Sequence, residues 1–286
     1  MWFSSVLSLF AVLCGTWNLK WFPSGRAEHR ASPRVEAANV ADAAELVRNG
    51  LSSHMRNDEG VVLFFQELRD GNALSNLVAV IDAKGIKMVS VSAFRERDNR
   101  LGWQQCGMAS NLPVVDSGFA YWKRPHRVYP PRGYSYALLD GGKEGLIACY
   151  CVHLKSDYGA TTDELRRANR EKREVCAEQI VALAKGLKAP DGRRVSKVLV
   201  GGDFNADPSS PRYGEERTAA IMAKGGFRDG WDGVPYEERI THPGTRRNRG
   251  TTIDFVYARG FLQCDLHVAS PEIPLSDHRM AWFRYE

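Results

Sequence analysis

The sequence contains 286 residues, of which 43% are hydrophobic and 26% are charged, and this mixture is typical of a soluble globular protein with a large core. Its net charge of +5 suits a polyanionic partner without requiring one, because basic residues scattered over a solvated surface give the same total. None of the six cysteines forms a Cys-x-x-Cys pair, which argues against a structural zinc site.

The N-terminal residues 1–13 are apolar and resemble the core of a signal peptide, although no Lys or Arg precedes them and no good small-residue cleavage site follows. The segment is too short for a bilayer span, which needs about 20 apolar residues, so we expect no stable membrane insertion. Residues 1–10 are interpreted as an apolar leader that runs into the first strand. The sequence leaves two locations for the protein, the cytoplasm or a compartment reached by export through this leader.

Apolar runs that predict buried strands alternate with amphipathic patterns that predict helices along the whole chain. The predicted strands cover residues 10–17, 61–65, 87–93, 104–109, 134–139, 146–152, 198–200 and 252–258, and the chain closes with the apolar residues 280–283. The predicted helices cover residues 33–49, 72–83, 161–187 and 215–224. Because no repeat, low-complexity tract or linker interrupts this pattern, we expect one α/β domain over residues 1–286.

The segment 198–208 places two polar side chains directly after a buried strand. Gly201 and Gly202 are predicted to end the strand and to let a ligand approach the backbone closely. Asp203 and Asn205 are two residues apart, so on an extended segment they point to the same side. The carboxylate could act as a base or a cation ligand and the amide could donate to a phosphate oxygen, whereas the simpler alternative is an Asx turn.

Further acids and histidines stand in other predicted strands or at their ends. Glu67 follows an all-apolar strand, where a buried carboxylate is costly unless a partner such as a divalent cation compensates it. Asp254 lies inside an apolar strand, and His278 near the C-terminus is its natural partner. His153 ends another strand. For each of these residues a purely structural role is the alternative.

Six short motifs occur in order along the chain: Thr16-Trp17-Asn18-Leu19, Phe65-Gln66-Glu67-Leu68, His153-Leu154-Lys155-Ser156, Gly202-Asp203-Phe204-Asn205, Ile253-Asp254-Phe255 and Ser276-Asp277-His278. This ordered set covers nearly the whole chain and resembles the endonuclease/exonuclease/phosphatase superfamily. The resemblance implies a four-layer α/β/β/α sandwich in which helices flank two mixed β-sheets, with the site at one edge. It also implies hydrolysis of a phosphoester with a divalent metal.

The resemblance implies a metal site built from three residues. Glu67 would be the main ligand, with Asn18 and Asp277 beside or near it. Hard oxygen ligands suit Mg²⁺, which keeps several of its waters and binds through few carboxylates. We therefore expect Mg²⁺ as the cofactor, with Mn²⁺ or Ca²⁺ as alternatives.

The resemblance also implies catalytic roles for the remaining motif residues. Asp203 would orient and deprotonate the attacking water, and Asn205 would hold the phosphate. His278, steadied by Asp254, and His153 would donate to the phosphate oxygens. Negative charge builds up on these oxygens during the attack, so donors and a cation placed there would lower the barrier.

The expected substrate is a DNA or RNA backbone, with DNA first because of the basic net charge. The loop residues Arg246, Arg247 and Arg249 could grip a phosphate backbone or could belong to a solvated turn. A small-molecule or lipid phosphoester is the alternative substrate, and a catalytically silent binding module is a third hypothesis that the intact set of acids and histidines opposes. We expect no obligate protein partner and a monomer.

Overall fold

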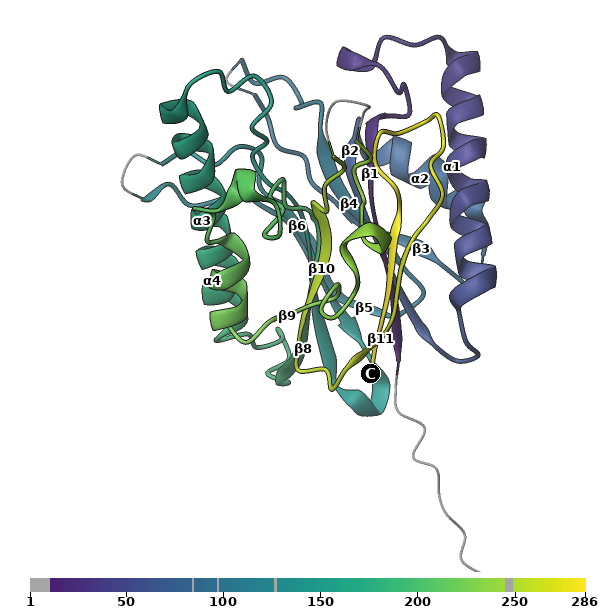
Figure 1. Ribbon diagram of the computed structural model, residues 1–286. Helices are drawn as coiled ribbons and strands as arrows, with labels where there is room; N and C mark the ends of the chain where they lie inside the picture. The colour runs from purple at the N-terminus through teal and green to yellow at the C-terminus, as the bar shows by residue number, and fades with distance from the viewer. Residues whose placement is uncertain (1–10, 84, 97, 126–127, 245–248) are drawn as a thin grey trace, which may run out of the picture.

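The computed structural model describes residues 11–83, 85–96, 98–125, 128–244 and 249–286. In these ranges two β-sheets face each other, and helices cover the outer face of each sheet (Figure 1). Helices α1 (Pro33–His54) and α2 (Gly71–Ile81) lie on one side, and α3 (Asp163–Ala184) and α4 (Thr218–Lys224) lie on the other. This order of layers confirms the predicted α/β/β/α sandwich.

The first sheet is built from strands β1 (Val12–Phe22), β2 (Gly60–Leu68), β3 (Lys87–Val91), β4 (Gln105–Ser110), β11 (Cys264–Ala269) and β12 (Ala281–Tyr285). Within the described ranges their order across the sheet is β11-β12-β1-β2-β4-β3. The neighbours β1 and β2 run parallel and the other pairs run antiparallel, so the sheet is mixed.

The second sheet is built from strands β5 (Val114–Ala120), β6 (Tyr134–Asp140), β7 (Leu146–His153), β8 (Val195–Asp203), β9 (Arg228–Asp229) and β10 (Asp254–Arg259). Their order is β5-β6-β7-β8-β10-β9, again for the described residues. Here β7 and β8 are the parallel pair, and β6 and β7 form an antiparallel hairpin. The long helix α3 provides the crossover that a parallel pair requires.

The three long helices begin where capping side chains accept a backbone N–H, namely those of Ser32, Asp70 and Thr162. The predicted start of the first helix at Ser32 is therefore confirmed. Its predicted end near Gly50 is wrong, because α1 continues to His54. Gly50 is buried inside the helix and packs against the indole of Trp282, where a Cβ would lie 2.2 Å from Cζ2.

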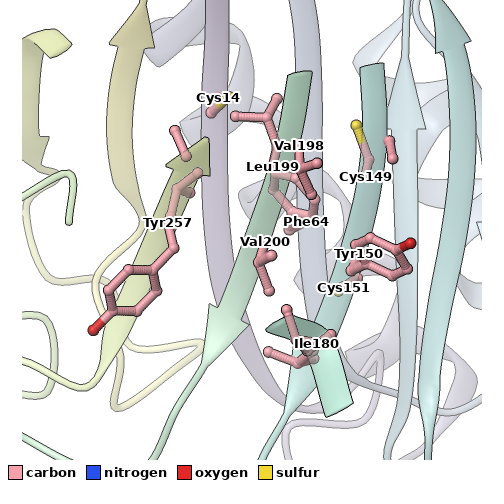
Figure 2. Packing of buried hydrophobic residues seen from close by; sticks show 14 of the residues in the cluster. Cys14, Phe64, Cys149, Tyr150, Cys151, Ile180, Val198, Leu199, Val200 and Tyr257 are labelled. Carbon is pink, nitrogen blue, oxygen red and sulfur yellow. The ribbon is translucent and has the colours of Figure 1, made fainter. Parts of the chain in front are cut away.

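Side chains alternate along the strands and divide the core into two clusters. Leu13 of β1 packs in the cluster under α1 and α2, whereas Cys14 belongs to the cluster between the sheets. Figure 2 shows part of that second cluster, including Cys14 and Phe64 from the first sheet and Leu199 from β8. A Cβ on Gly201 would lie 2.3 Å from Cδ2 of Phe64, so this glycine lets the sheets approach closely.

The predicted strand at residues 198–200 is longer in the structure. β8 begins at Val195 and continues through Gly201 and Gly202 to Asp203. The prediction that the two glycines end the strand is wrong, because β7 and β10 pair with β8 on both sides up to this point. The ladder hydrogen bonds thus hold in place two residues that have weak strand propensity of their own.

Strands β5, β9 and β11 were not expected from the sequence. Most residues of β5 and β11 are exposed or half-buried, and β9 has only two residues. Strands β5 and β11 therefore lack the apolar run that marks a buried strand. All three strands lie at the outside of a sheet, and pairing with the neighbouring strand decides their conformation.

The apolar leader expected at residues 1–10 lies outside the described ranges. None of the helices in the part of the chain that the structure describes combines the length and apolar character that a bilayer crossing requires.

Gly202 gives a stability prediction, since its φ of 151° and its packing both disfavour a side chain. A Cβ there would lie 1.9 Å from the carbonyl oxygen of Val152. We expect Gly202→Ala to lower the free energy of unfolding by about 2–5 kcal/mol, through backbone strain and overpacking. The control is Gly71→Ala, because nothing lies within 4 Å of the position of a Cβ at Gly71. Equal urea midpoints for the two variants would contradict the prediction.

Candidate active site

Three neighbouring strands of the second sheet bring three polar side chains into a row where β7 and β8 end and β10 begins. This end of the sandwich is called the edge below. In the ladder His153 of β7 pairs with Asp203 of β8, and Asp203 pairs with Asp254 of β10. All three side chains are buried. Gly201, two residues before Asp203, faces Phe64 of the first sheet, so alternation also directs Asp203 toward the first sheet.

The first sheet contributes Asn18 from β1 and Glu67 from β2. The register of β2 against β4 shifts between Phe65 and Leu68, and Glu67 has a φ of 59°. Regular alternation would place Glu67 on the helix side with Phe65, but this irregularity turns its carboxylate toward the seam between the sheets. Nδ2 of Asn18 donates to Oε1 of Glu67 at 3.3 Å and to Oδ2 of Asp203 at 3.0 Å. One amide thus joins the two sheets.

The loop between β11 and β12 brings His278 to the same edge. Its Nδ1 lies 2.8 Å from Oδ2 of Asp254, and its Nε2 lies 4.0 Å from Oδ2 of Asp203. Nε1 of Trp17 donates to the carbonyl of His278 at 3.0 Å, and Oγ of Ser276 accepts from its N–H at 3.0 Å. The two side chains that were expected to pair, Asp254 and His278, are therefore in contact.

The charges of this buried group are coupled. Burial by itself would lower the pKa of His278, but the carboxylate of Asp254 outweighs it and raises the pKa to about 10. Burial, and then the charge of Asp254, raise the pKa of Asp203 to about 7. In the metal-free protein an imidazolium ring therefore lies between two buried carboxyl groups and compensates part of their charge.

His153 approaches the same point from β7. Its Nε2 lies 3.7 Å from Oδ2 of Asp203 and 3.9 Å from Oε1 of Glu67. Burial, and then the charge of Arg132, lower the pKa of His153 well below its ordinary value, so the ring is neutral at pH 7. Its Nδ1 has no hydrogen-bond partner among the described residues. A neutral imidazole can still donate through its single N–H, which suits contact with a phosphate oxygen.

Asn205 lies in a turn and not on an extended segment. Its φ is 52°, and its backbone N–H donates to Oδ1 of Asp203 at 2.8 Å, which makes the Asx turn that the sequence left as an alternative. The expectation of an extended segment after Asp203 is wrong, because the chain turns as soon as β8 ends. The side chain of Asn205 nevertheless stays at the edge, where its Nδ2 donates to the carbonyl of Leu154 at 3.2 Å.

The residues expected to hold a metal offer a suitable set of donors. Glu67 has a half-buried carboxylate at the seam, and hard oxygens of this kind suit Mg²⁺. Asn18 presents its NH₂ group to the carboxylates, while its Oδ1 accepts from the N–H of Lys20 at 3.0 Å, so ligation would require the amide to present its oxygen. Asp277 is half-exposed and pairs with Nζ of Lys20 at 3.1 Å. The carboxylate of Glu67 thus fits a divalent cation, whereas Asn18 and Asp277 would have to leave their present partners to join it.

A second group of possible ligand atoms is better explained without a metal. Atoms of Asp203, Asp254 and His278 lie within 4.8 Å of one another. His278 already uses Nδ1 for Asp254, and its positive charge stands where a cation would otherwise be needed. We therefore interpret this group as a charge-coupled pair beside Asp203.

Of the three arginines expected to bind substrate, only Arg249 lies in the part of the chain that the structure describes. Arg246 and Arg247 lie outside the described residues. Arg249 is exposed, pairs with Glu237 at 2.8 Å, and lies 4.3 Å from the centre of the Tyr236 ring. A role of this loop in substrate binding remains a proposal.

Two residues that support the site were missed in the sequence. The half-buried side chain of Arg132 donates from its guanidinium to the carbonyl of His153 at 3.2 Å and to Oε1 of Gln104. Oγ1 of Thr241 accepts from the backbone N–H of Asp254 at 3.1 Å. A single arginine after two prolines, just before a strand that pairs with β7, was the only signal for the first, and the second had none.

A sandwich of two sheets with carboxylates, amides and histidines gathered at one edge defines a class of hydrolases that act on phosphoester bonds. Residues 15–278 match the Endonuclease/Exonuclease/phosphatase family, and the chain belongs to this family. The family generally uses a divalent metal. The comparison with curated proteins found no match.

Solved structures show the same fold at low sequence identity. An endonuclease/exonuclease/phosphatase from Beutenbergia cavernae DSM 12333 is 15% identical with a TM-score of 0.66, over 96% of this chain and 71% of that one. D. rerio TDP2 complexed with a single strand DNA product is 14% identical with a TM-score of 0.60, over 96% and 99% of the two chains. Sphingomyelinase C from Streptomyces griseocarneus is 14% identical with a TM-score of 0.57, also over 96% and 99%.

The contact between His278 and Asp254 predicts how the ring titrates in metal-free protein. NMR of the imidazole should give a pKa near 10, far above its ordinary value of about 6.5. Because the folded pKa is raised, this pair stabilises the fold fully below pH 6.5, and the contribution is lost as the pH rises through about 10. Asp254→Asn should lower the pKa well below 10, since burial would then be opposed only by the charges of Asp203 and Asp277. An unchanged pKa in that variant would contradict the coupling.

Proposed function

We propose that the protein is a divalent-metal-dependent phosphodiesterase that cleaves nucleic-acid backbones through attack by an activated water. The observation that carries this proposal is the meeting of Glu67, Asp203 and His278 at the seam of the two sheets. Glu67 and Asp203 each lie within 4 Å of both Asn18 and His153, and Nε2 of His278 lies 4.0 Å from Oδ2 of Asp203. A metal ligand, a base and a charged donor thus surround one position.

The proposed metal would be held mainly by Glu67, with Asn18 and Asp277 beside or near it. When bound, Mg²⁺ supplies positive charge that offsets the negative charge of the phosphate oxygens. The protein itself supplies the surroundings: Trp21 donates its backbone N–H to Oε2 of Glu67 at 3.1 Å and holds that carboxylate in position. Mn²⁺ or Ca²⁺ could take the same oxygen ligands.

The proposed chemical step uses groups on both sides of Asp203. Its Oδ1 accepts from the N–H of Asn205 and its Oδ2 accepts from Nδ2 of Asn18. If the amide of Asn18 presents its oxygen to the metal, Oδ2 is the oxygen that is left to accept the proton from the attacking water. As the bond from the water oxygen to phosphorus forms, the bond from phosphorus to the leaving oxygen breaks. His278 and His153 donate to the phosphate oxygens, where charge accumulates. Asn205 holds the phosphate through its amide.

Two features favour a nucleic acid as the substrate. The net charge of the sequence is +5, which favours a polyanion, and one similar structure, D. rerio TDP2, was solved with a single strand DNA product. A lipid or small-molecule phosphoester is the second candidate, since Sphingomyelinase C has the same fold. The hypothesis of a silent binding module is disfavoured by the complete set of acids and histidines.

The proposal is tested with supercoiled plasmid in the presence of Mg²⁺ and, separately, of EDTA. We expect nicking with the metal only. Glu67→Gln should reduce the nicking rate at least about 10²-fold with the fold intact, because the amide cannot supply the charge that holds the metal. The control is Glu45→Gln on the exposed side of α1, which should behave like the wild type.

Two outcomes would contradict this assignment. If Glu67→Gln kept normal turnover and Mg²⁺ dependence, Glu67 would not be the main ligand. If the wild-type protein left plasmid and single-stranded DNA and RNA intact but released the head group of sphingomyelin or phosphate from small esters, the second candidate would replace the first.

The pair formed by Asp254 and His278 should act as one catalytic unit. We expect Asp254→Asn to lower kcat by about 10²–10⁴-fold, the range for donor and proton-transfer groups, because the ring loses its orientation and charge. His278→Ala should cost a similar factor, and the double variant little more. The measurement is a double-mutant cycle on kcat, in which multiplied losses would show that the two residues act independently.

A further inference from the structure

Two tryptophans lie together beside the site and have no part in the proposed chemistry. Trp21 is half-buried near the end of β1, and Trp103 is 37% exposed just before β4. Their ring centres are 6.0 Å apart with 59° between the planes. Although 82 positions separate them in the sequence, the fold places them in one pair, which leaves aromatic surface open to solvent.

A histidine fixes the positions of both tryptophans. Nδ1 of His29 lies 3.0 Å from the carbonyl oxygen of Trp21, and its Nε2 lies 2.7 Å from that of Trp103. The same imidazole packs edge-on against the ring of Trp21 at 5.6 Å. Two segments distant in the sequence, residues 21–29 and the segment of Trp103, thus meet in one preformed surface, which lowers the ordering that ligand binding requires.

This surface is connected to the candidate active site by two chains of contacts. The backbone N–H of Trp21 donates to Glu67, the expected metal ligand. Gln104, next to Trp103, accepts from Arg132, which in turn donates to the carbonyl of His153. The tryptophan pair therefore has a defined position relative to both sides of the site.

The chemistry around Trp103 suits a flat polar ring better than a lipid chain. The guanidinium of Arg100 lies 5.8 Å from the centre of the Trp103 ring. Next to the ring is a hollow of about 490 Å³, a size typical of small-ligand sites, lined by Glu96, Asp98, Arg100, Leu101 and Trp103. Three of these five residues are charged, so an acyl chain would meet few apolar partners. Carboxylate oxygens can instead accept from the amino groups of a nucleobase.

We propose that Trp21 and Trp103 form a stacking platform for an unpaired base of the nucleic-acid strand, close to the phosphate that is cleaved. This inference rests on the proposed nuclease function and narrows its substrate. A base inside a duplex has both π-faces covered by its stacked neighbours, so it can lie on the platform only after it has left the stack. Single-stranded or unpaired segments are therefore the favoured substrates.

The test compares a single-stranded oligonucleotide with a strand of the same length in which tetrahydrofuran replaces every nucleoside. For the wild type we expect a higher kcat/KM on the strand with bases. Trp103→Ala should reduce the ratio of the two kcat/KM values by about 5- to 150-fold, the loss expected for one stacked base. Trp103→Phe, which keeps an aromatic face, should retain most of the ratio.

Binding measured in EDTA provides a second readout that does not depend on catalysis. Fluorescence anisotropy with a labelled single strand should show a similar loss of affinity for Trp103→Ala. The control is Leu262→Ala, because Leu262 is 66% exposed and follows β10 at the end opposite Asp254. This variant should keep both the ratio and the affinity of the wild type.

The outcomes separate this inference from the function on which it rests. If the wild type cleaves nucleic acid but Trp103→Ala leaves the ratio and the affinity unchanged, or lowers cleavage of both strands equally, the platform is refuted and the nuclease function stands. If the wild type neither binds nor cleaves either strand while it hydrolyses another phosphoester, both are refuted.

Discussion

The hydrogen bond between His278 and Asp254 is the interaction on which the rest of the site depends. Asp254 and Asp203 are paired across neighbouring strands, and both are buried, so their charges would oppose each other without a cation. His278 supplies that cation from a loop that Trp17 also holds. Loss of the ring would leave two like charges in the interior, a far greater cost than loss of an exposed ion pair. The arrangement of the buried side chains at this edge therefore depends on the contact between His278 and Asp254.

The sequence was a good guide wherever one residue and its neighbours decide the outcome. Apolar runs located most of the central strands, and the ordered motifs led to the correct family and fold. An acid inside an apolar strand also suggested a partner, and the contact of Asp254 with His278 is present. In these cases the cost of burial is local, so it can be inferred from the side chain and its immediate surroundings.

The sequence was a poor guide where pairing across the sheets decides. Two glycines normally weaken a strand, yet Gly201 and Gly202 continue β8 because both neighbouring strands pair with it. The orientation of Glu67 depends on a register shift in β2, and no residue in the motif of Glu67 predicts this shift. The contact of Arg132 with the carbonyl of His153, at the end of β7, is also not predicted by the residues around Arg132. These outcomes depend on partners that are distant in the chain.

The candidate site lies between the two sheets, so the distances between its residues depend on how the core packs. Glu67 comes from the first sheet and Asp203 from the second, and the amide of Asn18 contacts both. Their separation is therefore set by how closely the sheets pack just behind the edge, where Phe64 lies against Gly201. Because packed interiors have little freedom to compress or expand, that contact fixes the spacing of the candidate catalytic groups. The same residues that stabilise the sandwich thus set the distance between the proposed metal ligand and the proposed base, which come from different sheets.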